Sequence, residues 1–246
     1  MRIRLPWQKS TKVKSLLNRL FGSKTAPVQG TPVFMHIPKT AGTTLNTAIS
    51  SHYDAERVAY LYPPHNITAP ETVGELDFFG GHLVYGEHES YGIEDPQYFT
   101  FLRDPVDRIV SQYYYSARYH DGEHGGHVLD GHMEPYLSQT KIWFFDNCMT
   151  RMFAGIRDEV AFGSLDDEVY ETAVRNAKTF LFIGTQENFD EDQQRLASLL
   201  DWKSDAKSKR LNTGGYRREE IRDSDARYLE TLSHYDQRLY AEFAGS

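Results

Sequence analysis

The sequence predicts one α/β domain built on a mostly parallel sheet. Short apolar runs alternate along the chain with longer segments whose apolar residues recur at helical spacing, which is typical of consecutive β–α–β units. The chain has 246 residues, 39% of them hydrophobic, which suits one large domain. Its 16 Tyr and 14 Phe supply ample material for a core, so wholesale disorder is excluded.

Four short apolar runs are expected to be strands. Each is bounded by turn-forming residues and is short for a helix. The four runs are 33–36, 77–81, 98–102 and 180–184. The segments 53–76 and 119–137 are expected to be surface loops.

Helical periodicity covers much of the remaining chain. Asp104 is expected to cap a helix that has Pro105 at its first position, since this pair is favoured at helix starts. Ser164 is expected to open a later helix, and Asn188 another, with Glu191 completing a capping box. The expected helices span 43–49, 105–115, 138–153, 165–178, 188–200 and about 219–243.

The charge is distributed unevenly along the chain. Residues 1–30 hold seven basic and no acidic residues, so the remainder holds 20 basic and 35 acidic residues, a net charge of −15. We therefore expect a basic tail at 1–30 and a separate acidic domain at 31–246. An acidic body is a poor binder of nucleic acid, whose phosphates require a basic surface. For the tail two hypotheses stay open: a mobile segment, or a basic amphipathic helix at 13–21 that rests on an anionic membrane or partner.

The cysteine content and the hydropathy of the chain indicate the cellular compartment in which the protein is expected. The single cysteine, Cys148, excludes an intramolecular disulfide framework and any zinc finger or iron–sulfur site built on several cysteines. No apolar run approaches the ~20 residues that span a bilayer. A cytoplasmic location is expected, with contact at the inner face of the membrane through the tail left open.

The strongest chemical signal lies where the first strand meets the first helix, in the segment His-Ile-Pro-Lys-Thr-Ala-Gly-Thr-Thr at 36–44. Such a turn directs backbone N–H groups and the positive end of a helix dipole at one place, which suits a phosphate or sulfate. It is not a Walker A sequence, because the lysine precedes the glycine. The candidate anion-binding residues are Pro38, Lys39, Thr40, Ala41, Gly42, Thr43 and Thr44.

A second signal follows the strand at 98–102. Arg103 comes directly after that strand, and Ser111 lies about two turns into the next helix. Ligands of open α/β sheets bind outside the carboxyl ends of strands, so Arg103 could meet a second phosphate beside the first. The planar guanidinium suits that group. Taken alone, a structural salt bridge explains Arg103 equally well.

Together the two segments resemble the paired motifs of sulfotransferases that use 3′-phosphoadenosine 5′-phosphosulfate (PAPS). His-Ile-Pro-Lys-Thr and Arg-Asp-Pro-x-x-Arg-x-x-Ser-x-Tyr-Tyr-Tyr are typical of the carbohydrate branch that includes the heparan sulfate 2-O-sulfotransferases, and a bacterial member is expected. The resemblance covers roughly residues 32–243. It implies a P-loop-like three-layer domain with PAPS as co-substrate and no metal. It also implies that the first motif holds the 5′-phosphosulfate and that Arg103 and Ser111 hold the 3′-phosphate.

Between the motifs lies Gly-Gly-His-Leu-Val-Tyr at 80–85. In the 2-O-sulfotransferases a similar segment carries the catalytic base, so the resemblance assigns that role to His82, with Lys39 stabilising charge on the leaving phosphate. This chain has Gly80 where those enzymes have another histidine, so the resemblance supports the assignment of the base but does not imply the same glycosaminoglycan acceptor. An imidazole of ordinary pKa (~6.5), raised by an anionic donor, would titrate at or above neutrality. The alternative for His82 is a hydrogen-bonded structural histidine.

These observations favour a sulfotransferase that sulfates a hydroxyl of a carbohydrate or glycan-like acceptor. Two other functions stay open. One is a P-loop nucleoside or sugar kinase that uses ATP and Mg²⁺. The other is a catalytically silent module that binds a 3′-phosphonucleotide or a glycan.

For three further segments the sequence leaves more than one role open. The histidines at 120–132 are interpreted as a solvated loop rather than a metal site, because zinc ligands need fixed geometry, and this loop is a candidate for acceptor contact. The segment 147–151 either faces the acceptor or provides a helix cap and surface charge. The basic run of Lys207, Lys209 and Arg210 either closes over the nucleotide, with Arg210 as a binding residue, or is a solvated surface.

Overall fold

A computed structural model describes residues 30–40, 42–50, 52–62, 66–68, 76–119, 133–202 and 221–244. The described residues contain one six-stranded sheet in the order β3-β2-β4-β1-β5-β6. Five strands are parallel, and β3 pairs antiparallel with β2 at one edge. The strands are β1 (Thr31–Met35), β2 (Val58–Tyr62), β3 (Asn66–Thr68), β4 (Phe78–Gly81), β5 (Pro96–Leu102) and β6 (Phe182–Thr185). The predicted α/β class and mostly parallel sheet are confirmed.

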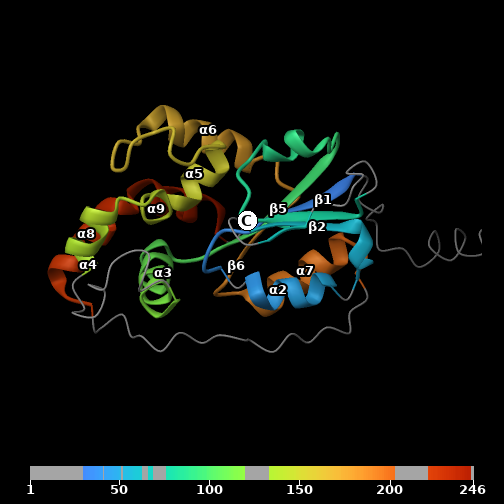
Figure 1. The fold of residues 1–246 in the computed structure, drawn as a ribbon, viewed down its shortest axis with the longest axis horizontal. Coiled ribbons are helices and arrows are strands. Elements are labelled where there is room, and N and C mark those ends of the chain that lie inside the picture. The colour runs from blue at the N-terminus through green and yellow to red at the C-terminus, as the bar shows by residue number, and fades with distance from the viewer. Residues whose placement is uncertain are drawn as a thin grey trace, which may run out of the picture.

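Helices cover both faces of the sheet, which makes three layers (Figure 1). One face carries α2 (Gly42–Ser50) and α7 (Phe189–Leu199), and the other carries α5 (Cys148–Ala154) and α6 (Asp167–Ala177). The remaining helices gather beside the sheet: α3 (Pro105–Tyr119), α4 (Met133–Thr140), α8 (Asp223–Leu232) and α9 (His234–Phe243).

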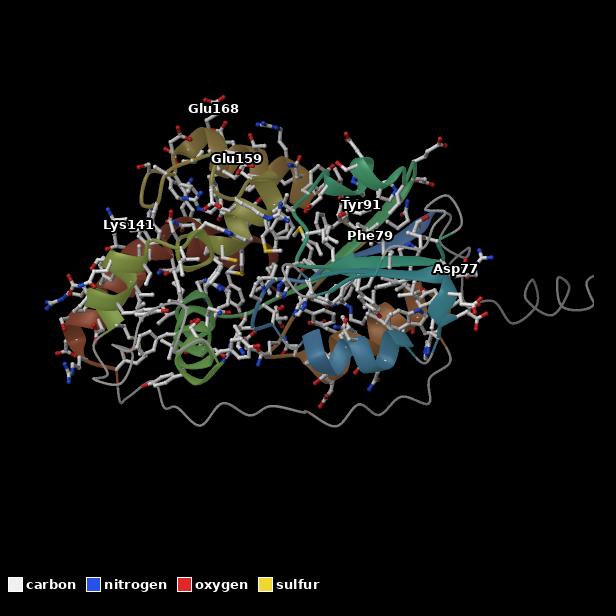
Figure 2. All side chains as sticks on the ribbon, viewed as in Figure 1. Asp77, Phe79, Tyr91, Lys141, Glu159 and Glu168 are labelled. Carbon is white, nitrogen blue, oxygen red and sulfur yellow. The ribbon has the colours of Figure 1, made fainter. Side chains whose placement is uncertain are left out.

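The alternation of side chains along each strand divides the core between the two faces of the sheet. In β1, Phe34 packs on the α2 and α7 side, whereas its neighbours Val33 and Met35 pack with residues of α5 and α6. Phe79 of β4 lies on that second side, with its ring centroid 4.9 Å from that of Tyr91 (Figure 2). A separate apolar cluster joins α3, α4 and α8. Strands buried on both faces explain why their sequences read as continuous apolar runs.

Two expected helices are each divided into shorter elements. The segment 138–153 was expected as one helix but contains the end of α4, a 3₁₀ turn η5 (Trp143–Phe145) and α5. Lys141 and Asn147 have positive φ angles of 47°, which interrupt an α-helix. The expected final helix at 219–243 is α8 followed by α9, with the break at Ser233. In both places contacts with distant parts of the chain outweigh local helical propensity.

Helix caps were predicted with mixed success. The carboxylate of Asp104 accepts a hydrogen bond from the backbone N–H of Asp107 (3.0 Å), so the predicted start of α3 is confirmed. Asp166, not Ser164, caps α6 by accepting from the N–H of Val169 (3.0 Å). Asn188 precedes α7 as expected, but its side chain makes no capping hydrogen bond.

The predicted loop at 53–76 contains β2 and β3. The strand β2 has only five residues, with Tyr60 and Tyr62 on one face and Ala59 and Leu61 on the other, so no polar and apolar alternation identifies it as a strand. Its pairing with β4 therefore became visible only in the folded sheet.

Parts of the chain lie outside the described residues, among them the basic tail except Gly30 and the His-rich segment 120–132. The tail hypotheses and the boundary between tail and domain stay predictions. Within the described ranges, no helix is both long and apolar enough to cross a membrane.

Candidate functional site

The strand order creates a switch point between β1 and β5. The two strands are parallel neighbours, but the chain leaves β1 through α2 toward β2 on one side and leaves β5 toward β6 on the other. Their outgoing loops therefore diverge at the carboxyl ends of the strands, which is where ligands of open α/β sheets bind. The first motif lies in the loop after β1, and Arg103 begins the loop after β5.

Lys39 and Arg103 meet at this switch point. Arg103 Nη1 donates a hydrogen bond to the carbonyl oxygen of Lys39 (3.2 Å), and Lys39 adopts a positive φ of 72°. Burial, followed by the positive charge of Arg103, lowers the pKa of the Lys39 ammonium to about 8. Two adjacent cations favour a bound anion, whose charge would offset their repulsion. The sequence predicted that these two residues would be neighbours.

The rest of the first motif forms a tight turn into α2. The Thr40 hydroxyl is buried and donates to the carbonyl oxygen of Ile37 (2.8 Å), which closes the turn. Pro38 lies in the turn, and Thr44 is buried in the first turn of α2. Ala41 and the side chain of Thr43 lie outside the described part of the chain.

Gly42 is required by a close approach to His36. A Cβ atom at Gly42 would lie 1.8 Å from Nε2 of His36, far inside van der Waals contact. The glycine therefore lets the first turn of α2 pack against the imidazole that ends β1. The helix α2 begins three residues after Lys39, and the N-terminus of a helix is where an anion is favoured.

The second motif runs from Arg103 into α3, and one face of this helix approaches the first motif. Ser111 is partly exposed and lies one helical turn before Tyr115, so the two side chains share a face of the helix. Lys39 Nζ lies 4.1 Å from the centroid of the Tyr115 ring. The face that carries Ser111 is therefore the face turned toward Lys39. Tyr115 is the last tyrosine of the second motif, but its contact with Lys39 was not predicted, since only the fold brings the two together.

His82 follows β4 directly and lies beside the end of β1. Its ring centroid is 4.8 Å from that of His36 and 4.9 Å from that of Tyr62. Burial, followed by the charges of Arg157 and Lys39, lowers the pKa of His82 to about 4. The imidazole is consequently neutral at pH 7 and able to accept a proton.

His36 is a second imidazole in the site, with less freedom than His82. It is buried, stacks on Phe34 at 5.2 Å between centroids, and has Nδ1 3.1 Å from the Tyr62 hydroxyl. Asn46 Nδ2 donates to the same hydroxyl (2.7 Å). Burial, followed by the charges of His82 and Lys39, holds the pKa of His36 well below its usual value. Tyr62 was missed in the sequence because β2 was not predicted.

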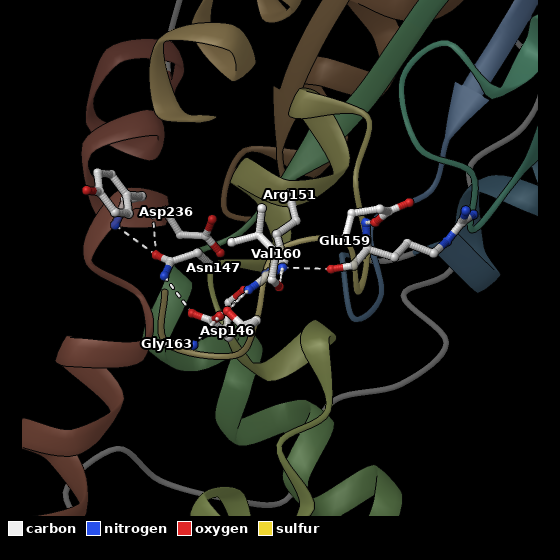
Figure 3. Close-up of polar contacts among 10 residues, drawn as sticks. Asp146, Asn147, Arg151, Glu159, Val160, Gly163 and Asp236 are labelled. Atoms are coloured by element: carbon white, nitrogen blue, oxygen red, sulfur yellow. Dashed lines mark hydrogen bonds and ion pairs between the residues drawn. The ribbon is translucent and has the colours of Figure 1, made fainter. Parts of the chain in front are cut away.

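Segment 147–151 has a structural role. The buried Arg151 guanidinium pairs with Asp146, and Asn147 Oδ1 accepts from the N–H groups of Tyr235 (2.8 Å) and Asp236 (3.2 Å) (Figure 3). The Asp236 carboxylate in turn accepts from the N–H and hydroxyl of Thr150 (2.7 and 2.9 Å). These contacts join α5 to α9, so the capping alternative explains the segment.

Several predicted residues cannot be compared with the structure. Lys207, Lys209, Arg210 and the histidines at 120–132 lie outside the described ranges. Among the residues that are described, no three His, Cys, Asp or Glu side chains are grouped so that they could hold a metal ion.

Comparisons with known proteins give one partial sequence relative. No family model matches the chain. The heparan sulfate 2-O-sulfotransferase hst-2 of Caenorhabditis elegans is 29% identical over 108 aligned positions, which cover 36% of this chain. The match spans about a third (32%) of that relative's length. It confirms the expected resemblance to heparan sulfate 2-O-sulfotransferases over part of the chain.

Two solved structures are similar at low sequence identity. Mouse sulfotransferase SULT7A1 complexed with PAP is 13% identical with a TM-score of 0.40, covering 87% of this chain and 67% of that one. A sulfotransferase from Alicyclobacillus acidocaldarius is 17% identical with a TM-score of 0.41, covering 87% of this chain and 100% of that one.

Proposed function

We propose that this chain transfers a sulfuryl group from PAPS to a hydroxyl of a carbohydrate or glycan-like acceptor. The observation that carries the proposal is the meeting of Lys39 and Arg103 at the switch point, beside the neutral imidazole of His82. The partial similarity to a heparan sulfate 2-O-sulfotransferase supports the same chemistry.

The residues at the switch point suit a ligand with two anionic groups. Lys39 and the first turn of α2 would bind the 5′-phosphosulfate, since both present positive charge at the end of β1. Arg103 would bind the 3′-phosphate through its planar guanidinium, with Ser111 as a hydroxyl donor from the facing helix.

The proposed reaction is an in-line displacement at sulfur, akin to phosphoryl transfer. As the acceptor oxygen bonds to sulfur, its proton passes to His82, and the bond between sulfur and the 5′-phosphate oxygen breaks. Lys39 stabilises the charge that develops on the leaving phosphate; removing one such donor typically costs ~10²–10³ in rate. A positioned base contributes ~10²–10⁴. This scheme requires no metal ion.

Thermal unfolding with nucleotides tests the proposal against its alternatives. The protein is heated with 3′,5′-ADP, ATP or GTP, each with and without Mg²⁺. We expect 3′,5′-ADP alone to stabilise it, by ~2.7 kcal/mol at 100 times its Kd. Stabilisation by ATP that depends on Mg²⁺ would instead support the kinase. Binding of 3′,5′-ADP without transfer from PAPS to any of a panel of glycans would support the silent module.

The basic tail is proposed to act as a surface anchor. Seven basic residues in 1–30 complement an anionic membrane, which matches a cytoplasmic protein held at the inner membrane face. Both the anchor and the location stay predictions.

A further inference from the structure

Arg157 reaches the backbone of His82 from the loop after α5. Its Nη2 donates to the carbonyl oxygen of His82 (3.1 Å) and to Oε2 of Glu87 (2.6 Å). The same Glu87 oxygen accepts from the N–H of Val84 (3.0 Å). Arg157 and Glu87 together therefore hold both ends of the turn 82–84, and we call this ion pair the 157–87 clamp. The motif analysis gave no signal for either residue.

The loop that carries Arg157 is itself fixed by a buried guanidinium. Arg151 Nη1 donates to the carbonyl oxygens of Arg157 (2.6 Å) and Val160 (2.7 Å), and Arg151 Nη2 donates to that of Ala161 (3.1 Å) (Figure 3). The Asp146 carboxylate pairs with Arg151 and also accepts from the N–H of Gly163 (2.8 Å). The carbonyl groups of the loop therefore surround the Arg151 guanidinium, and these hydrogen bonds fix the backbone of Arg157.

We propose that the 157–87 clamp positions His82 to accept the acceptor proton, with Arg157 acting through the backbone and charge of the His82 turn rather than on the reacting atoms. This inference rests on the proposed function, because it assigns a role within the same site. Arg157 is a positioning residue in this scheme. The side chains of the pair are 29% and 21% exposed, so water screens the pair only in part.

Titratable groups from several elements surround the turn that carries His82. His36 and Lys39 lie at the end of β1, Tyr62 ends β2, Glu87 lies in the 3₁₀ helix η3 (Glu87–Tyr91), and Arg157 follows α5. After burial, Arg157 has the largest influence on the pKa of His82, ahead of Lys39, and both lower it.

The positive charge of Arg157 affects the protonation state of His82 in the proposed reaction. A bound phosphosulfate raises the pKa of a nearby imidazole and would protonate the base before it acts. Arg157 opposes this change from a fixed position, whereas the charge of Lys39 would be engaged by the anion itself. The Arg157 charge therefore favours the neutral form of His82 in the complex in which that ring must take up a proton, and Glu87 holds Arg157 in position.

Titration of the His82 ring by NMR tests the clamp. Wild type, Arg157→Gln, Arg157→Lys and Glu87→Gln would be compared, with Arg238→Gln as a control that removes a surface arginine paired with Asp167. We expect Arg157→Gln to raise the pKa of His82 by about one unit, since it removes a nearby positive charge. Glu87→Gln removes a negative charge, so it should leave the pKa at or below the wild-type value.

The lysine variant separates charge from geometry. Arg157→Lys keeps the charge, but its shorter side chain lacks the Nη2 atom that donates to both His82 and Glu87. We expect a pKa near that of wild type and kcat lowered about 10-fold or more, with KM for PAPS little changed. Arg157→Gln should lower kcat and also move the acidic limb of the pH–rate profile to higher pH.

Two results would overturn the proposed role of the 157–87 clamp. One is a folded Arg157→Gln protein in which His82 titrates as in wild type, and the other is a pKa that moves upward in both Arg157→Gln and Glu87→Gln. The titration uses no co-substrate and no acceptor, so it tests the clamp even if the protein fails to bind 3′,5′-ADP. That failure would count against the proposed function instead.

Discussion

The Arg103 guanidinium donates a hydrogen bond to the carbonyl oxygen of Lys39 at 3.2 Å, which joins the loops after two neighbouring parallel strands. The contact brings together two cations that are far apart in sequence, and it holds the Lys39 backbone at a φ of 72°. Arg103 therefore has two roles in the proposed site, one toward a phosphate and one toward the lysine loop.

Replacing Arg103 by alanine should discriminate between nucleotides. We expect 3′,5′-ADP to bind ~10- to 100-fold more weakly, because a hydrogen bond to a charged group contributes ~1.5–3 kcal/mol. The affinity for 5′-AMP should fall much less, since it lacks the group that Arg103 is proposed to hold. Isothermal titration calorimetry measures both affinities. Equal weakening of the two nucleotides would contradict the assignment.

Replacing His82 by asparagine removes the base at similar bulk. We expect turnover to fall by ~10² or more while the affinity for 3′,5′-ADP stays within a few-fold of wild type. An Asn variant that melts like wild type and transfers sulfate at a near-normal rate would move the search for the base to His36 and His88.

The pH dependence follows from the direction of the His82 shift. The sequence analysis started from an imidazole of ordinary pKa and placed the acidic limb at or above neutrality, whereas burial sets the value in the free protein at about 4. Activity should fall as pH drops through the pKa of His82, because the protonated ring cannot accept a proton. The acidic limb of the kcat profile should lie at higher pH than the acidic limb of the kcat/KM profile, because kcat/KM reports the free protein.

Gly42→Ala tests the contact between α2 and His36. The new Cβ would lie 1.8 Å from Nε2 of His36, so we expect a loss of ~1–3 kcal/mol in the free energy of unfolding. His36→Ala removes the obstructing ring, and the double variant should be less destabilised than the sum of the two single changes. Urea unfolding of all four proteins completes the cycle. Strict additivity would mean that the ring and the helix do not meet.

Arg151→Ala should be strongly destabilising. It leaves the buried Asp146 carboxylate without its cation and removes the donor that binds three loop carbonyls, which typically costs ~3–5 kcal/mol. Arg238→Ala, at a more exposed pair with Asp167, should cost ~1 kcal/mol or less. Urea unfolding compares the two variants. Similar losses would argue against a special role for the buried guanidinium.

Deleting residues 1–30 tests the surface anchor. We expect binding to anionic vesicles to disappear, since each basic residue near such a surface contributes ~1 kcal/mol before ordering costs. Sulfate transfer to a soluble acceptor should stay nearly unchanged. Vesicle sedimentation at moderate salt measures the first result, and a full-length protein that stays in the supernatant would favour the mobile tail.

Four of the six strands, and the loops that follow β1 and β5, could be predicted from the sequence. Short apolar runs identify strands locally, and residues that follow parallel strands lie at one edge of the sheet, so Lys39 and Arg103 could be grouped without a structure. His82 was added to them through the resemblance to the 2-O-sulfotransferases. The capping of α3 by Asp104 was equally predictable, because a cap depends on neighbours within one turn.

Contacts between residues far apart in the sequence became visible only in the tertiary structure. Tyr62 reaches His36 from a strand 26 residues away, Arg157 reaches His82 across 75 residues, and Asn147 joins α9 across 88. Periodicity and capping patterns describe contacts within a few residues, and they carry no information about partners this distant. For the same reason the breaks before α5 and α9 were missed: Asn147 leaves the helical conformation to make hydrogen bonds that exist only once the chain has folded.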